Sequence, residues 1–327
     1  MKRKSIVLVV LILLFLLVSI SSLWLGSAEI DFMAALFHRK GYETDSVILY
    51  SLRLPRLLAG ILAGIGLSLS GQLLQTVLAN PLASPNTVGV NAGAGLTVIL
   101  TLWLCPALSA YLPIAAFLGA FVTAIFIMIL SKSVGTSKST VILAGIACTT
   151  LFQAGISFVG SIDTDILASY NGFSLGSFAF VKMNDLLLPA IFIGVALVVS
   201  IILSARITVL SLGDVIAGSL GIRVNMLRYT VLILASLGAA SVISYAGLLG
   251  FVGLVVPHIA RKLYVGSLRF QIIISSLCGA ILVVVSDLLG RTLFAPSEVS
   301  VGIIMAFVGS PFFFILLFKR RGYRAEN

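Results

Sequence analysis

Ten apolar runs, separated by short polar breaks, limit what this chain can fold into more than any other feature of its sequence. A helix needs about 20 apolar residues to cross the hydrocarbon core of a bilayer, and most of the runs approach that length. Only 10% of the residues are charged, whereas a soluble domain typically carries roughly 25%. We therefore expect an all-α integral membrane protein with about ten transmembrane helices. The runs cover residues 5–25, 54–78, 88–104, 113–130, 140–160, 186–204, 227–245, 248–260, 270–290 and 300–318.

The basic residues orient these runs. If the N-terminus is cytoplasmic, 15 of the 21 Lys and Arg residues fall in inside segments and six fall outside. Cytoplasmic loops carry an excess of Lys and Arg, so this bias predicts an even number of spans with both termini in the cytoplasm. An odd number would place either Lys2-Arg3-Lys4 or Lys319-Arg320-Arg321 on the wrong side. Residues 5–25 are too long for the apolar core of a signal peptide and are interpreted as the first spanning helix.

The remaining polar residues exclude several classes of function. The net charge of +10 is spread between the apolar runs and forms no single patch, which argues against nucleic-acid binding. Three scattered cysteines and two histidines show no disulfide or metal spacing, so no cofactor is expected. The outer breaks at 27–53 and 161–185 suit short interfacial helices or a lid and are too short for a catalytic domain. The segment 135–140 lacks the glycine that precedes the lysine of a phosphate-binding loop, so the chain is not expected to be an ATPase or another enzyme.

Two arginines flank a proline at the start of the second run, in Arg53-Leu54-Pro55-Arg56. Proline is tolerated there because the N–H group that it lacks would have no partner in the first helical turn. Positive charge is depleted on the outer side of a membrane, so this pair either anchors phospholipid headgroups or docks an acidic partner. The run ends at Asn80-Pro81, where the proline breaks the helix at the cytoplasmic face.

Several strings of this chain occur together in one known family. They are RLPR at 53–56, SGQLLQ at 70–75, NPLASPNTVG at 80–89, LAG at 143–145, LSLGD at 210–214, GFVGLVVPHIAR at 250–261 and GSPFF at 309–313. In content and order they resemble the motifs of the FecCD-type permeases, the membrane subunits of ABC importers for iron-siderophores, haem and cobalamin. The resemblance covers nearly the whole chain. It implies a single transmembrane permease domain, residues 1–327, with the type II ABC importer permease architecture.

The resemblance also implies partners. They are a second permease subunit, identical or homologous, two ATP-binding subunits inside the cell and one extracytoplasmic substrate-binding protein, assembled at the lipid bilayer of a bacterial cytoplasmic membrane. Arg53, Arg56 and Arg291 match family positions that dock the binding protein. Asp287 and Arg291 also have the spacing of an ion pair within one helix, which is the competing explanation for that arginine.

The cytoplasmic segment at about 205–222 matches the part of these permeases that couples to the ATPase. Gly213 and Asp214 are expected to cap a short helix, and Ala217 and Leu220 are expected to face the ATPase. The matching residues are Leu212, Gly213, Asp214, Ala217, Leu220 and Gly221.

A large chelate needs a wide and weakly binding path, for which small polar side chains of the second run are candidates. These candidates are Ser68, Ser70, Gln72 and Gln75. The remaining motif positions are expected to be structural, with His258 a packed side chain; they are Asn80, Pro81, Pro257, His258 and Arg261. Ferric siderophore is the favoured cargo, and haem and cobalamin remain open. An ion-coupled secondary transporter is the distant alternative, disfavoured because Asp287 is the one acid near the interior of a run.

Overall fold

The computed structural model describes residues 2–134 and 138–312, and every regular element within these ranges is a helix. The predictions for residues 135–137, for the end of the tenth run and for Lys319-Arg320-Arg321 lie outside the described residues. The long helices are α1 (Lys2–Trp24), α4 (Leu54–Val77), α5 (Val90–Leu104), α6 (Leu112–Val134), α7 (Lys138–Ile162), α9 (Met183–Ser211), α11 (Val224–Ala246) and α13 (Leu268–Thr292). The shorter elements are α2 (Phe32–Leu36), α3 (Glu43–Val47), η1 (Ile48–Arg53), η2 (Pro106–Tyr111), α8 (Thr164–Leu175), α10 (Asp214–Ser219) and α12 (Val252–Leu263).

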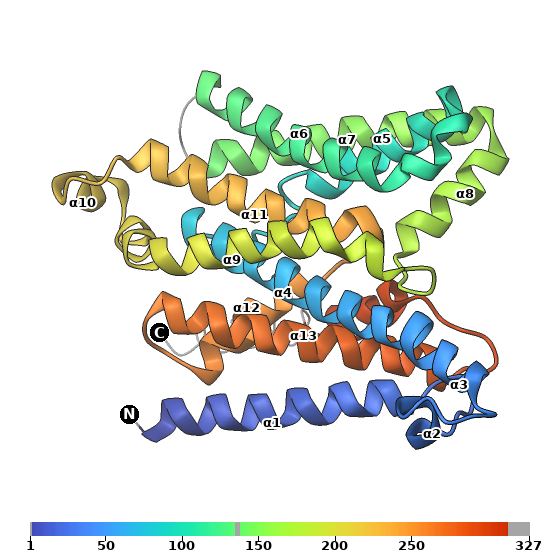
Figure 1. Ribbon diagram of the computed structural model, residues 1–327. Coiled ribbons are helices and arrows are strands. Elements are labelled where there is room, and N and C mark those ends of the chain that lie inside the picture. Colours follow the sequence, from blue (N-terminus) through green and yellow to red (C-terminus); the bar gives the residue numbers. More distant parts are fainter. Residues whose placement is uncertain (1, 135–137, 313–327) are drawn as a thin grey trace.

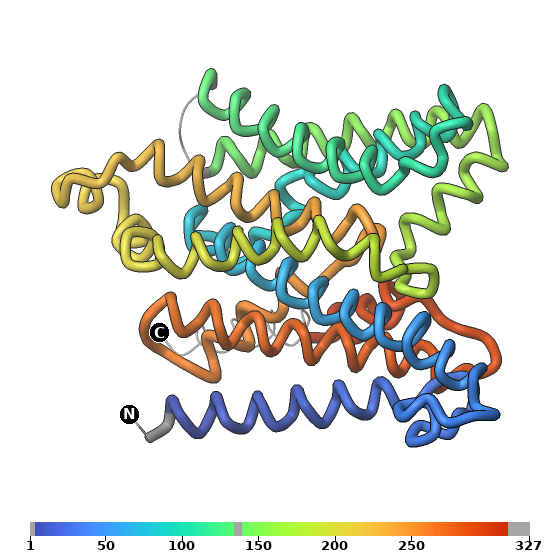
Figure 2. Tube along the Cα trace, in the orientation of Figure 1, coloured from blue at the N-terminus to red at the C-terminus, as the bar shows by residue number. Residues whose placement is uncertain are grey.

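The long helices lie side by side in three groups (Figures 1 and 2). One group holds α5, α6 and α7, the middle group holds α4, α9 and α11, and the third holds α1, α12 and α13. The groups are joined mainly by α11 against α6 and by α4 against α13. Helix α1 lies at the edge of the bundle and reaches the rest of the chain chiefly through α13.

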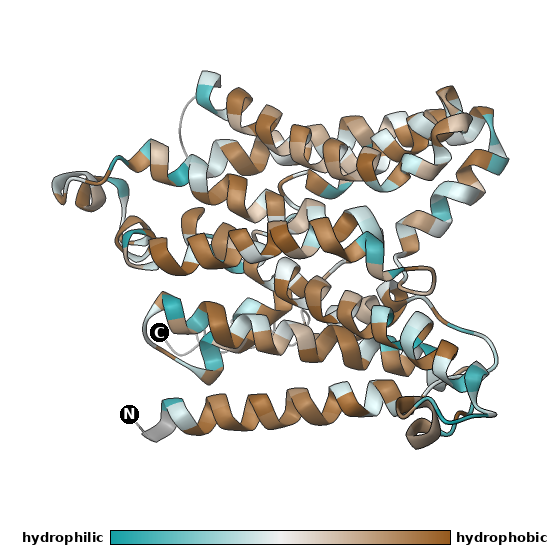
Figure 3. Cartoon of the chain, viewed as in Figure 1, coloured by the Kyte–Doolittle hydropathy of each residue, from teal (hydrophilic) through white to brown (hydrophobic). Residues whose placement is uncertain are grey.

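The distribution of hydropathy is that of a membrane protein. Apolar residues dominate the length of the helices, and polar residues gather at the two ends of the bundle (Figure 3). Among the described residues, seven helical segments are long and apolar enough to cross a bilayer, and each coincides with a predicted run. The other three runs form shorter helices over their described parts, namely α5, α12 and Val301–Phe312. The chain is a multi-pass membrane protein, as predicted.

The two ends of the bundle carry different elements. Helix α10 and the start of α1 lie at one end, whereas α2, α3 and α8 lie at the other (Figure 1). This is the arrangement expected if the N-terminus and the segment at 205–222 are both cytoplasmic. The outer breaks predicted to hold short helices contain α2 and α3 in one case and α8 in the other.

Helix α4 is central, and glycines let its neighbours approach closely. It contacts α9, α11, α12 and α13. A Cβ atom on Gly64 would lie 2.3 Å from the carbonyl carbon of Gly279 in α13, and one on Gly71 would lie 1.8 Å from the carbonyl oxygen of Gly253 in α12. Close backbone contact of this kind associates helices where lipid supplies no hydrophobic drive between them.

The eighth predicted run is interrupted before its helix begins. Phe251 has a φ angle of 64° and α12 starts at the next residue, so the run forms only a 12-residue helix. The backbone groups freed at such breaks pair between segments: the Ser177 N–H group donates to the Ala246 carbonyl at 2.9 Å, and the Gly302 N–H group donates to the Gly176 carbonyl at 3.5 Å. Irregular backbone inside a membrane protein is tolerated where the protein itself satisfies it in this way.

Candidate functional site

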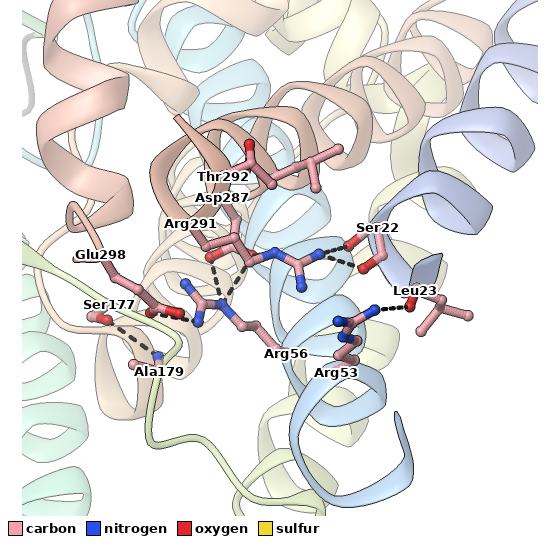
Figure 4. Close-up of polar contacts among 11 residues, drawn as sticks. Ser22, Leu23, Arg53, Arg56, Ser177, Ala179, Asp287, Arg291, Thr292 and Glu298 are labelled. Carbon is pink, nitrogen blue, oxygen red and sulfur yellow. Dashed lines mark hydrogen bonds and ion pairs between the residues drawn. The ribbon is translucent and has the colours of Figure 1, made fainter. Parts of the chain in front are cut away.

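A buried ion network lies at the end of the bundle that carries α2 and α3. Arg56, near the start of α4, donates through Nε to both carboxylate oxygens of Asp287, at 2.9 and 3.0 Å (Figure 4). Its Nη1 donates to Glu298 Oε2 at 2.8 Å. Arg291 Nε approaches Asp287 Oδ2 at 3.6 Å, so the ion pair expected from the spacing of these two residues is present. One carboxylate of α13 therefore faces two guanidinium groups.

Two of the arginines hold the end of α1. Arg53 Nη1 donates to the Leu23 carbonyl at 2.8 Å and to the Trp24 carbonyl, and its Nη2 donates to the Ala28 carbonyl. Arg291 Nη2 donates to the carbonyl and to the hydroxyl of Ser22. The last carbonyls of a helix have no partner within it, and cationic donors complement both those carbonyls and the negative end of the helix dipole. Arg53 and Arg291 thus cap the C-terminal end of α1, as Figure 4 shows.

Their burial changes the interpretation of the docking motif. Arg53 and Arg291 are 4% and 3% exposed, so neither is an open surface charge in this conformation. The side chain of Arg56 is 13% exposed and that of Glu298 is 33% exposed, which makes them the part of the network that solvent reaches. The docking role remains a prediction for all three arginines, and the structure gives Arg53 and Arg291 a clear role inside the chain.

Helix α10 protrudes from the opposite end of the bundle, between α9 and α11 (Figure 1). Gly213 is its N-cap residue as predicted, with a φ angle of 124° that favours glycine. Asp214 is the first residue of the helix, but its side chain does not cap it. The Asp214 carboxylate accepts two bonds from Arg228 Nη2, at 2.6 and 2.7 Å, which ties α10 to the buried face of α11.

The surface of α10 differs from the prediction in one respect. Leu220 is exposed as expected, but Ala217 is fully buried and cannot face a partner. Its carbonyl accepts the Ile222 N–H group at 3.0 Å as the chain turns back toward α11. Val215, which is not among the predicted coupling residues, is 87% exposed. The apolar tip of α10, defined as Leu212, Val215, Ile216 and Leu220, therefore replaces Ala217 as the candidate contact surface.

The polar residues of α4 divide into two pairs. Ser68 and Ser70 are fully buried, and Ser70 Oγ lies 2.7 Å from the Gly66 carbonyl and 2.6 Å from the Ala235 carbonyl of α11. The prediction that these serines line an open path is wrong for this conformation, because Ser68 lies against Gly279 of α13 and Ser70 lies against Gly238 of α11. Gln72 and Gln75 border a cavity of about 400 Å³ that is also lined by Arg261.

The motifs that run through these sites match one family along almost the whole chain. The sequence profile described as the FecCD transport family matches residues 9–319. The chain belongs to the FecCD transport family. It is 32% identical over 323 residues to the Fe(3+)-citrate import system permease protein YfmE of Bacillus subtilis (strain 168), covering 97% of this chain and 96% of that protein. It is 33% identical over 330 residues to the Probable siderophore transport system permease protein YfhA of the same organism, covering 98% of this chain and 96% of that protein.

A solved structure gives the same result for the fold. A structure described as an inward-facing conformation of a metal-chelate type ABC transporter matches with a TM-score of 0.86 at 28% identity. The match covers 96% of this chain and 99% of that one. The predicted all-helical permease architecture is confirmed.

The family motifs of this FecCD permease lie mainly at helix breaks. Asn80 and Pro81 follow the end of α4, where Ala79 has a φ angle of 47° and Asn80 Oδ1 accepts the Leu82 N–H group at 2.9 Å. Pro257 is buried inside α12, and the ring of the next residue, His258, meets the Phe312 ring edge-on at 6.1 Å. The described residues contain no group of three or more His, Cys, Asp or Glu side chains that could hold a metal ion.

One feature of the FecCD permease was missed at the level of sequence. A cavity of about 750 Å³ opens between α6, α8, α9 and α11, with an apolar wall that includes Phe117 and Phe192 and a polar edge at Lys182 and Asp185. The two phenylalanine rings stack with their centroids 5.4 Å apart. These residues are far apart in the sequence, so no local pattern could have indicated that they share one cavity.

Proposed function

We propose that this FecCD permease moves a ferric chelate, ferric citrate or a ferric siderophore, inward across the cytoplasmic membrane of a bacterium. The observation that carries the proposal is similarity over 97% of the chain to a permease named for Fe(3+)-citrate import. Similarity of that extent includes every spanning segment, so it supports the whole transport unit and is not confined to a shared helix pair. We further propose that all 327 residues form one permease domain.

The energy for transport comes, in this proposal, from ATP hydrolysed on two separate subunits. The apolar tip of α10 supports this, since exposed apolar clusters in water-facing segments mark contacts with other proteins. The ion pair between Asp214 and Arg228 would pass movement of α10 directly to α11. A second permease subunit and one binding protein complete the assembly, and the chain itself carries no cofactor.

Docking of the binding protein is proposed at the outer end, where Arg56 and Glu298 are partly exposed. Rim charges of this kind chiefly set the orientation and rate of encounter. Arg56→Gln should therefore slow association with the binding protein and reduce its dependence on salt. Arg39→Gln, an exposed arginine in the preceding outer segment, is the matched control. Equal association rates for both variants and the parent would remove Arg56 from the docking surface.

The cargo is tested by reconstituting the permease with its ATP-binding subunit and binding protein in liposomes that contain ATP. We expect radiolabelled iron to accumulate from ferric citrate or from a ferric siderophore only when ATP and the binding protein are both present. Haem and cobalamin serve as competitors. Uptake of either competitor in place of the ferric chelates would replace the proposed cargo with that compound. Uptake that follows an imposed ion gradient without ATP would instead support a secondary transporter.

A further inference from the structure

The cavity beside Gln72 and Gln75 lies at the end of α4 nearer α10, between α4, α9, α12 and the start of α13. Its volume is about 400 Å³. The lining combines polar side chains with a few apolar residues, and its one charged side chain is Arg261. The residues that line it include Gln72, Gln75, Thr208, Arg261, Leu268 and Gln271.

The positive charge of Arg261 has no carboxylate partner within the described residues. Its one hydrogen bond there is from Nη2 to Gln75 Oε1, at 2.5 Å, and the side chain is partly buried. Within the described residues, no carbonyl at the end of α4 accepts a hydrogen bond from Arg261. A guanidinium group has five N–H donors, and a partly enclosed charge is costly unless an opposite charge accompanies it.

Two further groups point to a ligand in this cavity. Gln72 is 1% exposed, and its Oε1 atom has no hydrogen-bond partner, while its Nε2 atom is 3.5 Å from Gln271 Oε1. Helix α13 begins at Leu268, on the cavity wall, and no side chain caps its first turn. The N-terminal end of a 25-residue helix attracts anions through its free N–H groups and its dipole.

We propose that this cavity binds a phosphate group, with Arg261 and the start of α13 as the anion site and Gln72 as a partner for a hydroxyl on the same molecule. A second cavity of about 440 Å³ shares Thr208 and Leu268 with the first and adds apolar side chains of α9, including Ile201 and Ile202. Basic pockets between spanning helices at the cytoplasmic side bind lipid headgroups. The phosphate belongs either to an anionic phospholipid or to free phosphate, and both present the same group to Arg261.

The test uses the full-length permease in detergent micelles, titrated with phosphatidylglycerol, phosphatidylcholine or inorganic phosphate, with bound lipid counted by native mass spectrometry and the thermal midpoint recorded. We expect Arg261→Gln to weaken phosphatidylglycerol binding about tenfold, the effect of losing one charge-assisted contact. Arg223→Gln removes an exposed cytoplasmic arginine outside the cavity and should leave binding unchanged. Stabilisation by inorganic phosphate alone, lost in Arg261→Gln, would support the site and identify free phosphate as its source.

A second variant keeps the proposal testable if Arg261→Gln does not fold. Gln271→Glu retains every cation and places a carboxylate on the wall of the same cavity. It should abolish the response to phosphatidylglycerol and to phosphate, and raise the thermal midpoint in phosphatidylcholine, because the protein then supplies its own anion. Equal binding of both phosphate sources by the parent, Arg261→Gln and Gln271→Glu would overturn the proposal.

Discussion

Replacing Arg53 with methionine removes the side chain that ties the end of α1 to the rest of the bundle. The parent guanidinium donates to the carbonyls of Leu23, Trp24 and Ala28. Methionine keeps an unbranched apolar stem but is shorter and has no donor, so the variant leaves three carbonyls without their partner. We expect α1 to loosen at this end while the central helices keep their packing.

The size of the effect follows from these contacts. A hydrogen bond to a charged group contributes about 1.5–3 kcal/mol. The three bonds of Arg53 share one side chain, and water at the membrane surface replaces part of what is lost, so we take a net loss of about 3 kcal/mol. That corresponds to an open population of the α1 end about 100-fold larger than in the parent.

Hydrogen exchange over residues 20–28 measures this opening directly, and fluorescence of Trp24, whose ring stacks on Phe32 with centroids 5.7 Å apart, reports it independently. Arg39→Met is the control, because Arg39 is exposed in the same outer segment. If Arg53→Met left exchange in residues 20–28 unchanged and only weakened binding-protein association, Arg53 would be a docking residue and the capping argument would fail.

Three further predictions follow from other contacts. Asp287→Asn should lower the free energy of unfolding by about 3–5 kcal/mol, because Arg56 and Arg291 lose their shared buried carboxylate. Glu298→Gln, at a partly exposed carboxylate, should change it by less than about 1 kcal/mol, and the thermal midpoints of the two variants test the difference. Val215→Asp should abolish ATP-driven uptake in liposomes while changing stability by less than about 0.5 kcal/mol, and normal uptake would exclude the tip of α10 as the coupling surface. Gly71→Ala should prevent the close approach of α4 to α12 and destabilise the fold by about 3 kcal/mol. Gly172→Ala, where an added Cβ atom meets nothing within 4 Å, should be neutral or stabilising, and the thermal midpoints of both variants test this.

The helices could be predicted because the bilayer fixes a length and a composition that each spanning segment must meet. Every predicted run contains a helix within its described part, although that of the eighth run begins only at Val252, and Gly213 caps α10 as expected. The failures concern contacts between distant segments. Arg53 lies 29 residues from Trp24 and Arg291 lies 269 residues from Ser22, so no local pattern could show that these arginines cap α1.

Burial of single residues was the second limit of the sequence. Ala217 and Val215 are both small and apolar, and helical spacing alone did not show which of them turns toward α11. Ser68 and Ser70 were candidates for an open path because they are polar, yet a hydroxyl can bond to backbone carbonyls of its own or a neighbouring helix and be buried at little cost. Polarity within a span therefore indicated a satisfied hydrogen bond as readily as a water-filled surface.

The contacts of α4 also restrict how this permease can move. The backbones of Gly64 and Gly279, and those of Gly71 and Gly253, lie in close contact, so we expect α4, α12 and α13 to shift as one body. Arg53 and Arg291 attach α1 to that body, since one lies at the start of α4 and the other on α13. The apolar tip of α10 is instead joined to α9 and α11. In the proposed mechanism, force applied at α10 enters through α9 and α11 and changes how they pack against the body of α1, α4, α12 and α13.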